Sequence, residues 1–353
     1  MTPTTPLALA SCLLLTTAQS VCAETGAPWT LNLYFENDLF SETDQDYTNG
    51  VRASWVSPNV NDYLNDERLP SWVRGITPYL PLFDPSDKNS TQLQRNVVIS
   101  VGQQIYTPQD IDRTTIDPND RPYAAWLYAG LAYHSRTKNR MNTAEINLGI
   151  VGPLAFGQEA QDFIHDIRGF KKFKGWDNQL KNEPGLQLVY EHKNRIIRGQ
   201  FSPFFEYDTI IHGGGSLGNV ATYLNAGAEV RFGWNLPQDF GTSALRSGGD
   251  NSAPGLGDGR YQRGSRNHNL GVHAFVSMDG RWVVQDIFLD GNTFRDSHSI
   301  DKEHLVGETA FGIAALYHGW KISFAQVHRS REFQTQDEGH AFGSLSVSYS
   351  YSI

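Results

Sequence analysis

The chain contains little cysteine and, beyond its first residues, no long apolar run. Both cysteines, Cys12 and Cys22, lie within the first 23 of 353 residues, so the rest of the chain has no disulfide to stabilise it. It also lacks the roughly 20 consecutive apolar residues that a membrane-spanning helix needs, and the mean hydropathy is −0.43. These absences exclude a disulfide scaffold and a helical membrane protein. They do not exclude a β-barrel, because alternating strands show no continuous apolar window.

The first residues have the pattern of an export signal. The stretch LALASCLLLTTAQSVCA has an apolar core followed by small residues before Glu24. It predicts a secretory signal peptide over 1–23, cleaved after Ala23. The alternative is a lipoprotein signal with Cys12 as the lipidated residue, which would leave the apolar LLLTT downstream. No linker, charge block or repeat divides the remainder, so we expect a single barrel domain over 24–353.

Strict alternation is clearest at the carboxyl end. In SLSVSYSYSI, serines at 344, 346, 348, 350 and 352 share one face, and apolar or aromatic residues share the other. A terminal strand of this kind is typical of an outer-membrane barrel, with the tyrosines at the membrane interface.

Further segments of similar character predict an all-β, transmembrane antiparallel barrel of about twelve strands. We interpret 281–291 as a protruding extension of the preceding strand or a hairpin outside the barrel, because single-chain barrels close with an even number. The polar segments 58–92 and 235–266 are expected to be periplasmic loops. The predicted strands are 30–37, 48–57, 94–106, 122–135, 141–152, 184–194, 197–210, 219–234, 267–279, 304–318, 319–331 and 342–353.

Three polar-rich segments follow the first, third and fifth strands, at 37–48, 104–121 and 153–183. In an antiparallel barrel with periplasmic termini, these three share the extracellular rim, where they can form one site. The first reads NDLFSETDQDYTNG and is rich in the oxygen ligands that a hard cation prefers. A solvated acidic loop would have the same composition. We expect Glu42, Asp44 and Asp46 to be solvent-exposed or to bind ions that bridge lipopolysaccharide.

The third segment predicts a short helix between Gly157 and Gly169, with Ala160, Phe163, Ile164 and Ile167 at helical spacing. Gln158, Gln161 and His165 lie along one helical edge. A histidine one turn beyond a glutamine is a candidate general base. The alternative is a surface histidine on an amphipathic loop helix.

The second segment supplies Arg113 and Arg121. Arg121 follows Asp120 and could pair with it for structural reasons alone. Guanidinium groups at an outer rim are also suited to the phosphates of lipopolysaccharide, which they bind in a bidentate way. Both residues are therefore candidate substrate-binding residues.

The motifs ENDLF…TDQDYTNG, GQQIYTPQDI…DRPYAAWLYAGL and GPLAFGQEAQDFIH, in this order, resemble the LpxR-type lipid A deacylase family of Gram-negative outer membranes. The resemblance is close over residues 30 to 185. It implies a twelve-stranded barrel and a calcium-dependent esterase that removes the 3′-linked acyloxyacyl chain of lipid A in the outer leaflet.

The resemblance also implies site residues. The family's helical histidine and glutamine fall on His165 and Gln161, its Asn-Asp pair on Asn37 and Asp38, and its threonine on Thr48. A basic residue of the second outer loop corresponds to Arg113. The chain departs from the family at Lys171, where a carboxylate is expected, and at Ala125, where a glycine is usual and alanine is expected to be tolerated.

The chemistry of ester hydrolysis needs an activated nucleophile and a group that stabilises the oxyanion. No serine adjoins His165 in the sequence, so we expect a water activated by His165, with Ca²⁺ held by Asp38 and Asn37 near Thr48. The net charge of −9 is compatible with recruiting divalent ions at an anionic surface and makes nucleic acid an unfavourable partner. We expect a monomer with lipid A or lipopolysaccharide as substrate.

Two other function classes remain open. A non-enzymatic pore or adhesin predicts a polar, unobstructed lumen. A phospholipase-type barrel with a Ser-His-Asn triad requires a serine within reach of His165, and Thr48 is the nearest hydroxyl candidate.

Overall fold

A computed structural model describes residues 27–38, 46–60, 62–79, 93–241, 248–250, 252–258, 260 and 270–352, without the side chains of 46–48. The predicted signal peptide, Glu42 and Asp44 therefore lie outside the described residues, as does the side chain of Asp46. No helix in the described part of the chain is long and apolar enough to cross a membrane.

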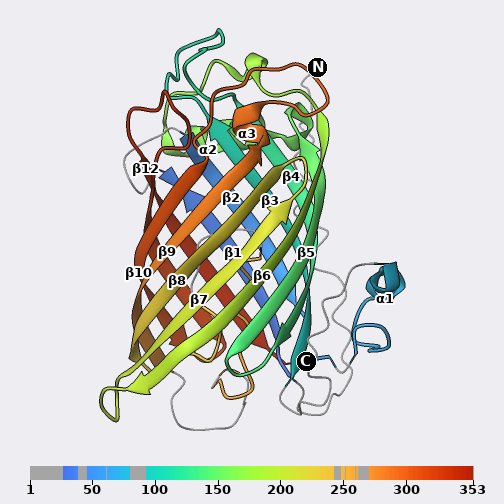
Figure 1. The fold of residues 1–353 in the computed structure, drawn as a ribbon, viewed down its shortest axis with the longest axis vertical. Helices are drawn as coiled ribbons and strands as arrows, with labels where there is room; N and C mark the ends of the chain where they lie inside the picture. Colours follow the sequence, from blue (N-terminus) through green and yellow to red (C-terminus); the bar gives the residue numbers. More distant parts are fainter. Residues whose placement is uncertain are drawn as a thin grey trace.

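Twelve strands form one closed antiparallel barrel, each paired with its neighbours in sequence and β1 paired with β12 (Figure 1). This confirms the predicted fold class and strand number. The strands are β1 (Trp29–Asn37), β2 (Asp46–Val56), β3 (Gln94–Thr107), β4 (Ala124–Arg136), β5 (Arg140–Val151), β6 (Glu183–Gln200), β7 (Glu206–Leu217), β8 (Ala221–Trp234), β9 (Leu270–Asp286), β10 (Leu305–Tyr317), β11 (Trp320–Arg329) and β12 (His340–Tyr351).

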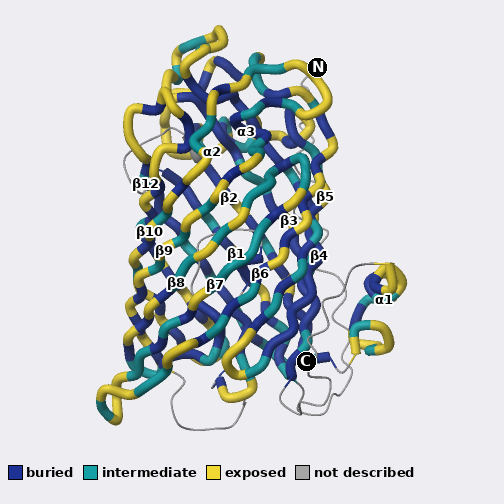
Figure 2. Tube along the Cα trace, viewed as in Figure 1, coloured by how far each residue is buried: buried dark blue, intermediate teal, exposed yellow. Residues whose placement is uncertain are grey.

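Alternation assigns the two faces of the wall. The even-numbered serines of β12 are buried towards the lumen, where Ser350 hydrogen-bonds Thr30 of β1 (2.9 Å) and Ser344 donates to Glu36 (2.8 Å). From Leu345 to Tyr351, the odd-numbered residues of β12 are less buried than these serines and, by alternation, face outward. Figure 2 shows how buried and more exposed residues alternate along the strands. A polar interior and an apolar exterior are what a strand wall surrounded by lipid requires.

Two strand boundaries differ from the sequence prediction. The expected break near residue 195 is wrong, because β6 continues through a bulge between Arg195 and Ile197 and turns back only at Phe201–Phe205. The segment 281–291 does not protrude. Its first part extends β9 within the wall, where Trp282 pairs with Leu224 and Leu305, and the chain then forms α3 (Ile287–Asp290).

The segment 235–266 is not a simple loop, because its described residues enter the barrel. Asp250 accepts hydrogen bonds from Arg52 and Ser54 of β2, and Asp239 is bound by Arg231 of β8 and Lys321 of β11. These partners come from walls far apart around the barrel, so the segment crosses the lumen. The interior is polar, as the pore interpretation requires, but it is obstructed.

The connections after β1, β3 and β5 share one rim, as predicted, because every pair of neighbouring strands is antiparallel. We call it the α2 rim, since it carries η4 (Pro153–Ala155), α2 (Gly157–Arg168), η5 (Trp176–Asn178) and α3. At the opposite rim, where β12 ends, α1 (Ser71–Ile76) and η3 (Thr77–Tyr79) lie outside the wall (Figure 1).

Candidate functional site

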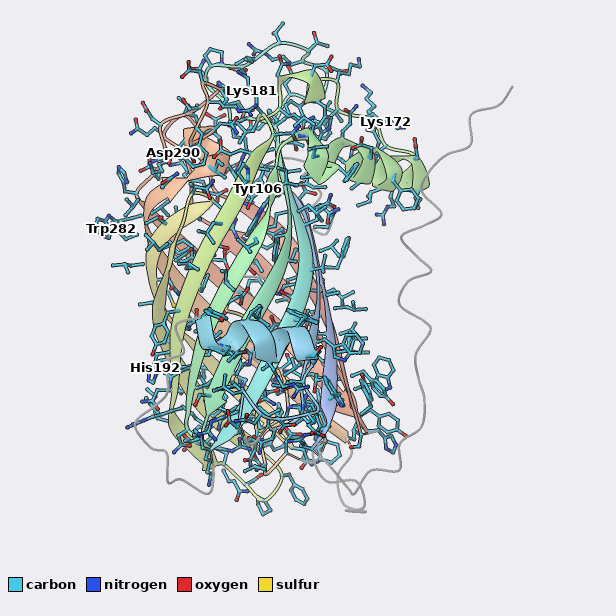
Figure 3. The ribbon with its side chains drawn as sticks, turned by 90° about the vertical axis from the view of Figure 1, so that its right-hand side faces the viewer. Tyr106, Lys172, Lys181, His192, Trp282 and Asp290 are labelled. Carbon is cyan, nitrogen blue, oxygen red and sulfur yellow. The ribbon has the colours of Figure 1, made fainter. Side chains whose placement is uncertain are left out.

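The chain leaves β5 and turns sharply onto the outside of the barrel. Gly152 has a φ of 101° and its N–H donates to the Ala125 carbonyl (3.0 Å). Gln103, on the outer face of β3, donates to the carbonyl of Ala155 (2.6 Å). These bonds fix the start of α2 against the outer wall, and Figure 3 shows the helix outside the barrel.

Helix α2 touches the wall through small residues. A Cβ on Gly157 would lie 2.4 Å from the Cβ of Ala125 on β4, so a glycine is required at the first helical position. The alanine at 125 is accommodated because its partner across the contact has no side chain. At the other end, Gly169 has a φ of 71°, and its N–H caps the helix by donating to the His165 carbonyl.

The helix buries its polar edge and exposes its apolar residues. Gln161 and His165 are each 2% exposed, whereas Phe163 is 56% and Ile167 is 67% exposed. The interpretation of His165 as a surface histidine is therefore wrong. Large apolar residues of α2 are thus exposed beside charged ones, and the buried edge forms a polar site.

His165 is oriented by the chain that follows the helix. Its Nδ1 is hydrogen-bonded to the main-chain carbonyl of Lys171, and its ring lies edge-on to Phe170 and Phe173, with centroids 6.0 and 5.7 Å away. A carbonyl oxygen only accepts, so Nδ1 carries the proton. In the neutral imidazole this leaves the lone pair on Nε2.

Gln161 is held one turn earlier. Its side-chain oxygen accepts from the indole N–H of Trp176 (3.1 Å), and Trp176 packs against Tyr123 with ring centroids 5.0 Å apart. The Gln161 Nε2 is buried and has no hydrogen-bond partner among the described residues. Its N–H groups are therefore available to a water or a substrate oxygen.

The end of β1 lies on the same rim and the same outer face. Register joins Asn37 to Asn49, Asn49 to Ile105 and Ile105 to Ala125, so these four residues form one row across β1 to β4. Leu31 and Leu33 are exposed on the outer face of β1, but Asn37 on that face is 2% exposed. The outer face of β1 is therefore shielded from the surroundings at Asn37, although it is exposed further along the strand.

The spacing of this row matches the length of the helix. Three strand steps of about 4.8 Å separate Ala125 from Asn37, about 14 Å in all. Eight residues of helix rise about 12 Å from Gly157 to His165. α2 starts at Ala125, contacts β3 and extends towards the side of the barrel where β2 lies (Figure 3).

The donors near the end of β1 fit a hard cation by their chemistry. Asp38 is fully buried just beyond the strand, and Asn37 and Asn49 are neighbours in register. The side-chain oxygen of Asn49 is buried with no hydrogen-bond partner among the described residues. Carboxylate and amide oxygens are calcium ligands. No group of three or more His, Cys, Asp or Glu residues suited to a metal occurs in the described ranges.

Two other predicted site residues lie at the same rim. Thr48 is at the bulge of β2 between Tyr47 and Asn49, and its side chain lies outside the described residues. Arg113 is part-exposed in the loop after β3, where it pairs with Asp117.

Arg121 is not brought to this site. It is buried on the lumen side over the ring of Tyr106, 4.7 Å from its centroid, and pairs with Glu332 (3.1 Å). Although burial acts in the opposite direction, the charges of Arg329 and Arg121 lower the pKa of Glu332 to about 2. Asp120 accepts from the backbone of Gln109 and Arg121, so the expected Asp120–Arg121 side-chain pair is replaced by these bonds.

Lys171 contributes its main chain to the site and its side chain to the neighbouring loop. Its ammonium lies 3.8 Å from Asp112, which Lys174 also binds at 2.7 Å. The hydrogen bond and charge of Lys174, with a further contribution from Lys171, lower the pKa of Asp112. These pairs connect the loop after β3 to the segment after α2.

Sequence reasoning missed three contributors: Trp176, Asn49 and the Lys171 carbonyl. Asn49 stands in the quoted motif TDQDYTNG, and Trp176 follows the helix within the polar segment 153–183, so their positions were a signal. A main-chain carbonyl leaves no residue-type signal in a sequence.

Comparisons with known proteins agree with this architecture. A family model described as "Outer membrane protein LpxR" matches residues 7–351. Among solved structures, LpxR from Salmonella typhimurium superposes with a TM-score of 0.67 at 19% identity, over 91% of this chain and 99% of that one. The β domain of the Bordetella autotransporter BrkA aligns over 94% and 100% of the two chains at 9% identity, with a TM-score of 0.43. No curated protein is significantly similar in sequence. The chain belongs to the LpxR family of outer membrane proteins.

Proposed function

We propose that this protein is a calcium-dependent lipid A deacylase that hydrolyses the ester of the 3′-linked acyloxyacyl chain. The observation that carries the proposal is His165, which is buried on the outer face of the barrel with its Nδ1 proton bound to the Lys171 carbonyl. Membership of the LpxR family supports the same function.

The imidazole of His165 acts as the general base. With Nδ1 protonated, Nε2 accepts a proton from a water that attacks the ester carbonyl carbon. The imidazolium then returns this proton to the departing alkoxide, so the acyl chain leaves as a carboxylic acid. Gln161, fixed by Trp176, donates its free N–H groups to the attacking water or to the carbonyl oxygen.

Asp38 and Asn37 hold the metal in this proposal, and Thr48 completes the polar end of the site. The buried carboxylate and the neighbouring amide oxygens of Asn37 and Asn49 are suited to Ca²⁺. When bound there, calcium supplies a Lewis acid that stabilises the charge of the oxyanion.

The substrate enters from the lipid side of the wall. The exposed side of α2 carries Phe163 and Ile167, and Leu154 and Phe156 are also exposed before it. Acyl chains can pack on this surface while the ester reaches the buried edge. We assign the α2 rim to the extracellular side, where lipid A is found, and propose that Arg113 contacts its phosphates. The luminal position of Arg121 favours a structural role.

The other two function classes have less support. The segment that crosses the lumen, from Asp239 to Arg260, blocks the open pore that the first alternative needs. The phospholipase alternative relies on a hydroxyl next to His165, whereas the hydrogen bond that orients the ring is made with the Lys171 carbonyl.

The test is a mass measurement on lipid A. Purified protein is incubated with lipid A with and without Ca²⁺, and the lipid and released acids are identified by mass spectrometry. We expect loss of the 3′ acyloxyacyl group, abolished by chelation, and a fall of roughly 10²–10⁴-fold in rate for His165→Ala. Gln158→Ala, an exposed residue of the same helix, is the matched control and should retain activity. Release of phospholipid fatty acids, or full activity of His165→Ala, would refute the proposal.

A further inference from the structure

We propose that residues 58–60 and 62–79, described parts of the connection from β2 to β3, form an arm that is embedded in the membrane interface. The outer face of this arm binds phospholipid at the rim opposite α2. The inference depends on the barrel spanning a membrane and is independent of the hydrolytic activity.

The arm is packed firmly on the outside of the wall. Its apolar residues Val60, Leu69 and Val73 are buried against the outward-facing side chains of β3 and β4, among them Val97 and Leu131. The Tyr63 hydroxyl donates to the His134 carbonyl (2.6 Å), and the hydroxyls of Thr77 and Tyr133 are 2.7 Å apart. A helix of six residues is not stable alone in water, so this packing holds α1 in place.

The exposed side of α1 and η3 carries a stripe of large apolar residues. Trp72, Ile76 and Tyr79 follow one another at intervals of four and three residues and are 51%, 40% and 86% exposed. They form a stripe beside the buried Val73 and Thr77, because successive residues of a helix are about 100° apart around its axis. A short helix whose exposed side carries apolar side chains this large is poorly suited to water. A surrounding of lipid accounts for this exposed stripe.

The position and type of these residues specify the interface. Figure 3 shows α1 lying across the barrel axis, outside the strands and in their lower half. An amphipathic segment lies in this orientation when it is parallel to a membrane surface. Tryptophan and tyrosine concentrate at the boundary between acyl chains and headgroups, because they have an apolar ring and a polar group.

The aromatic residues of the barrel wall leave a gap on the part of the wall that the arm covers. Near the rim opposite α2, Trp320 packs on Tyr349 (4.4 Å between centroids), and Trp55 donates to Tyr351 (3.0 Å). Register continues from Trp55 to residues without aromatic rings, Ile99 of β3, Leu131 of β4 and Ile146 of β5. The arm covers this sector and supplies Trp72 and Tyr79 outside it.

A second copy of the chain is a poorer occupant than lipid. A stable protein interface buries about 800 Å² on each partner, and the stripe consists of three side chains on a nine-residue segment. The stripe is also continuous with an outer wall whose other exposed residues, such as Leu33 and Val101, are apolar.

Site-directed spin labelling tests the arm. The full chain with Cys12→Ser and Cys22→Ser provides a cysteine-free background. Single cysteines replace Trp72, Ile76 or Tyr79, and the labelled protein is reconstituted in phosphatidylethanolamine and phosphatidylglycerol vesicles. Power saturation then compares collision with oxygen, which partitions into lipid, and with a water-soluble nickel chelate. Heat-modifiable gel mobility confirms that each variant forms the barrel.

Two control positions define the highest and lowest oxygen-to-nickel collision ratios expected. Val101→Cys reports the lipid-facing wall, and Glu67→Cys reports an exposed polar position of the same arm. We expect the oxygen-to-nickel ratio at 72, 76 and 79 to be several-fold above that at 67 and to approach that at 101. Ratios equal to that at 67 would overturn the proposal. So would spin–spin broadening at 72 that disappears on dilution with unlabelled protein, because it would identify a second copy as the occupant.

Discussion

Two short helices, α1 and α2, lie outside the same barrel wall at opposite rims, and they bury opposite kinds of side chain. α1 buries Val73 against the wall, whereas α2 buries Gln161 and His165. Both leave large apolar residues exposed. The exposed apolar residues indicate that both helices face lipid. The buried polar residues distinguish α2, as a candidate reactive site, from α1, as a packing contact.

After His165→Ala, the largest effect should come from the oxygen ligands at the end of β1. We expect Asp38→Ala to lower deacylation by about 10²–10³-fold, the usual loss when an oxyanion-stabilising group is removed. The effect should resemble that of chelation in the unmodified protein. The rate of lipid A deacylation over a range of Ca²⁺ concentrations measures it.

Asp112→Ala is the matched control for Asp38→Ala. Asp112 is an exposed carboxylate at the same rim that binds Lys174 and Lys171. Its loss should leave the calcium dependence unchanged. Equal losses of activity in the two variants would show that general acidity of the rim, and not a bound ion at Asp38, is what matters.

A smaller effect should follow from the helix cap that turns Lys171 back towards His165. Gly169 has a φ of 71°. A β-branched residue is strained there by about 1–2 kcal/mol or more, and loss of a partner that orients a catalytic group commonly costs about 10–100-fold. We expect Gly169→Val to lower kcat by this amount, with little change in KM.

Gly169→Asn is the conservative partner, because asparagine tolerates the left-handed region. It should restore most of the activity lost in Gly169→Val. The ¹⁵N chemical shifts of His165 should show Nδ1 protonated in the unmodified protein and in Gly169→Asn, and a mixture of tautomers in Gly169→Val. Unchanged shifts in Gly169→Val would rule out the orienting role of the carbonyl.

The exposed side of α2 should matter less than its buried edge. Ile167→Asp places a charge on the apolar side, which near a membrane interface costs about 0–1 kcal/mol. We expect up to about a fivefold loss of activity on lipid A in vesicles and no loss on a short, water-soluble ester. Equal losses on both substrates would mean that the substitution disturbs the site itself.

The smallest effect on activity should come from α1. Val73→Ala removes buried apolar contact and should destabilise the arm by about 1–3 kcal/mol. Proteolysis within residues 62–79 should become faster, while the rate of deacylation stays the same. A matching loss of deacylation would show that the two helices are coupled through the wall.

Much of this fold could be predicted from the sequence, because a two-residue period specifies both a strand and its two faces. The serines of β12 gave the lumen side correctly. The break between β6 and β7 was misplaced, because β6 passes through a bulge at Arg195 without ending. The crossing of the lumen depends on pairs such as Arg52 with Asp250, which lie 198 residues apart, and periodicity contains no information about such distant partners.

The choice of site residues stays a prediction, and the position of these residues in the fold could be predicted only in part. Helical spacing put Gln161 and His165 on one edge, and strand parity put them at the rim where β1 ends. Neither observation indicates which side of a wall a loop helix occupies. The side of the wall depends on contacts such as that between Gly157 and Ala125. Such a contact can be predicted only when the structures of both segments are known.

Photocross-linking to lipid A tests most directly whether the reactive site lies between α2 and the outer wall. Benzoylphenylalanine is placed at Phe163 on the exposed side of α2, or at Tyr223, which lines a cavity in the lumen. After irradiation with lipid A in vesicles, we predict an adduct at 163 and none at 223. An adduct at 223 alone would show that the substrate enters the barrel, and would contradict the account.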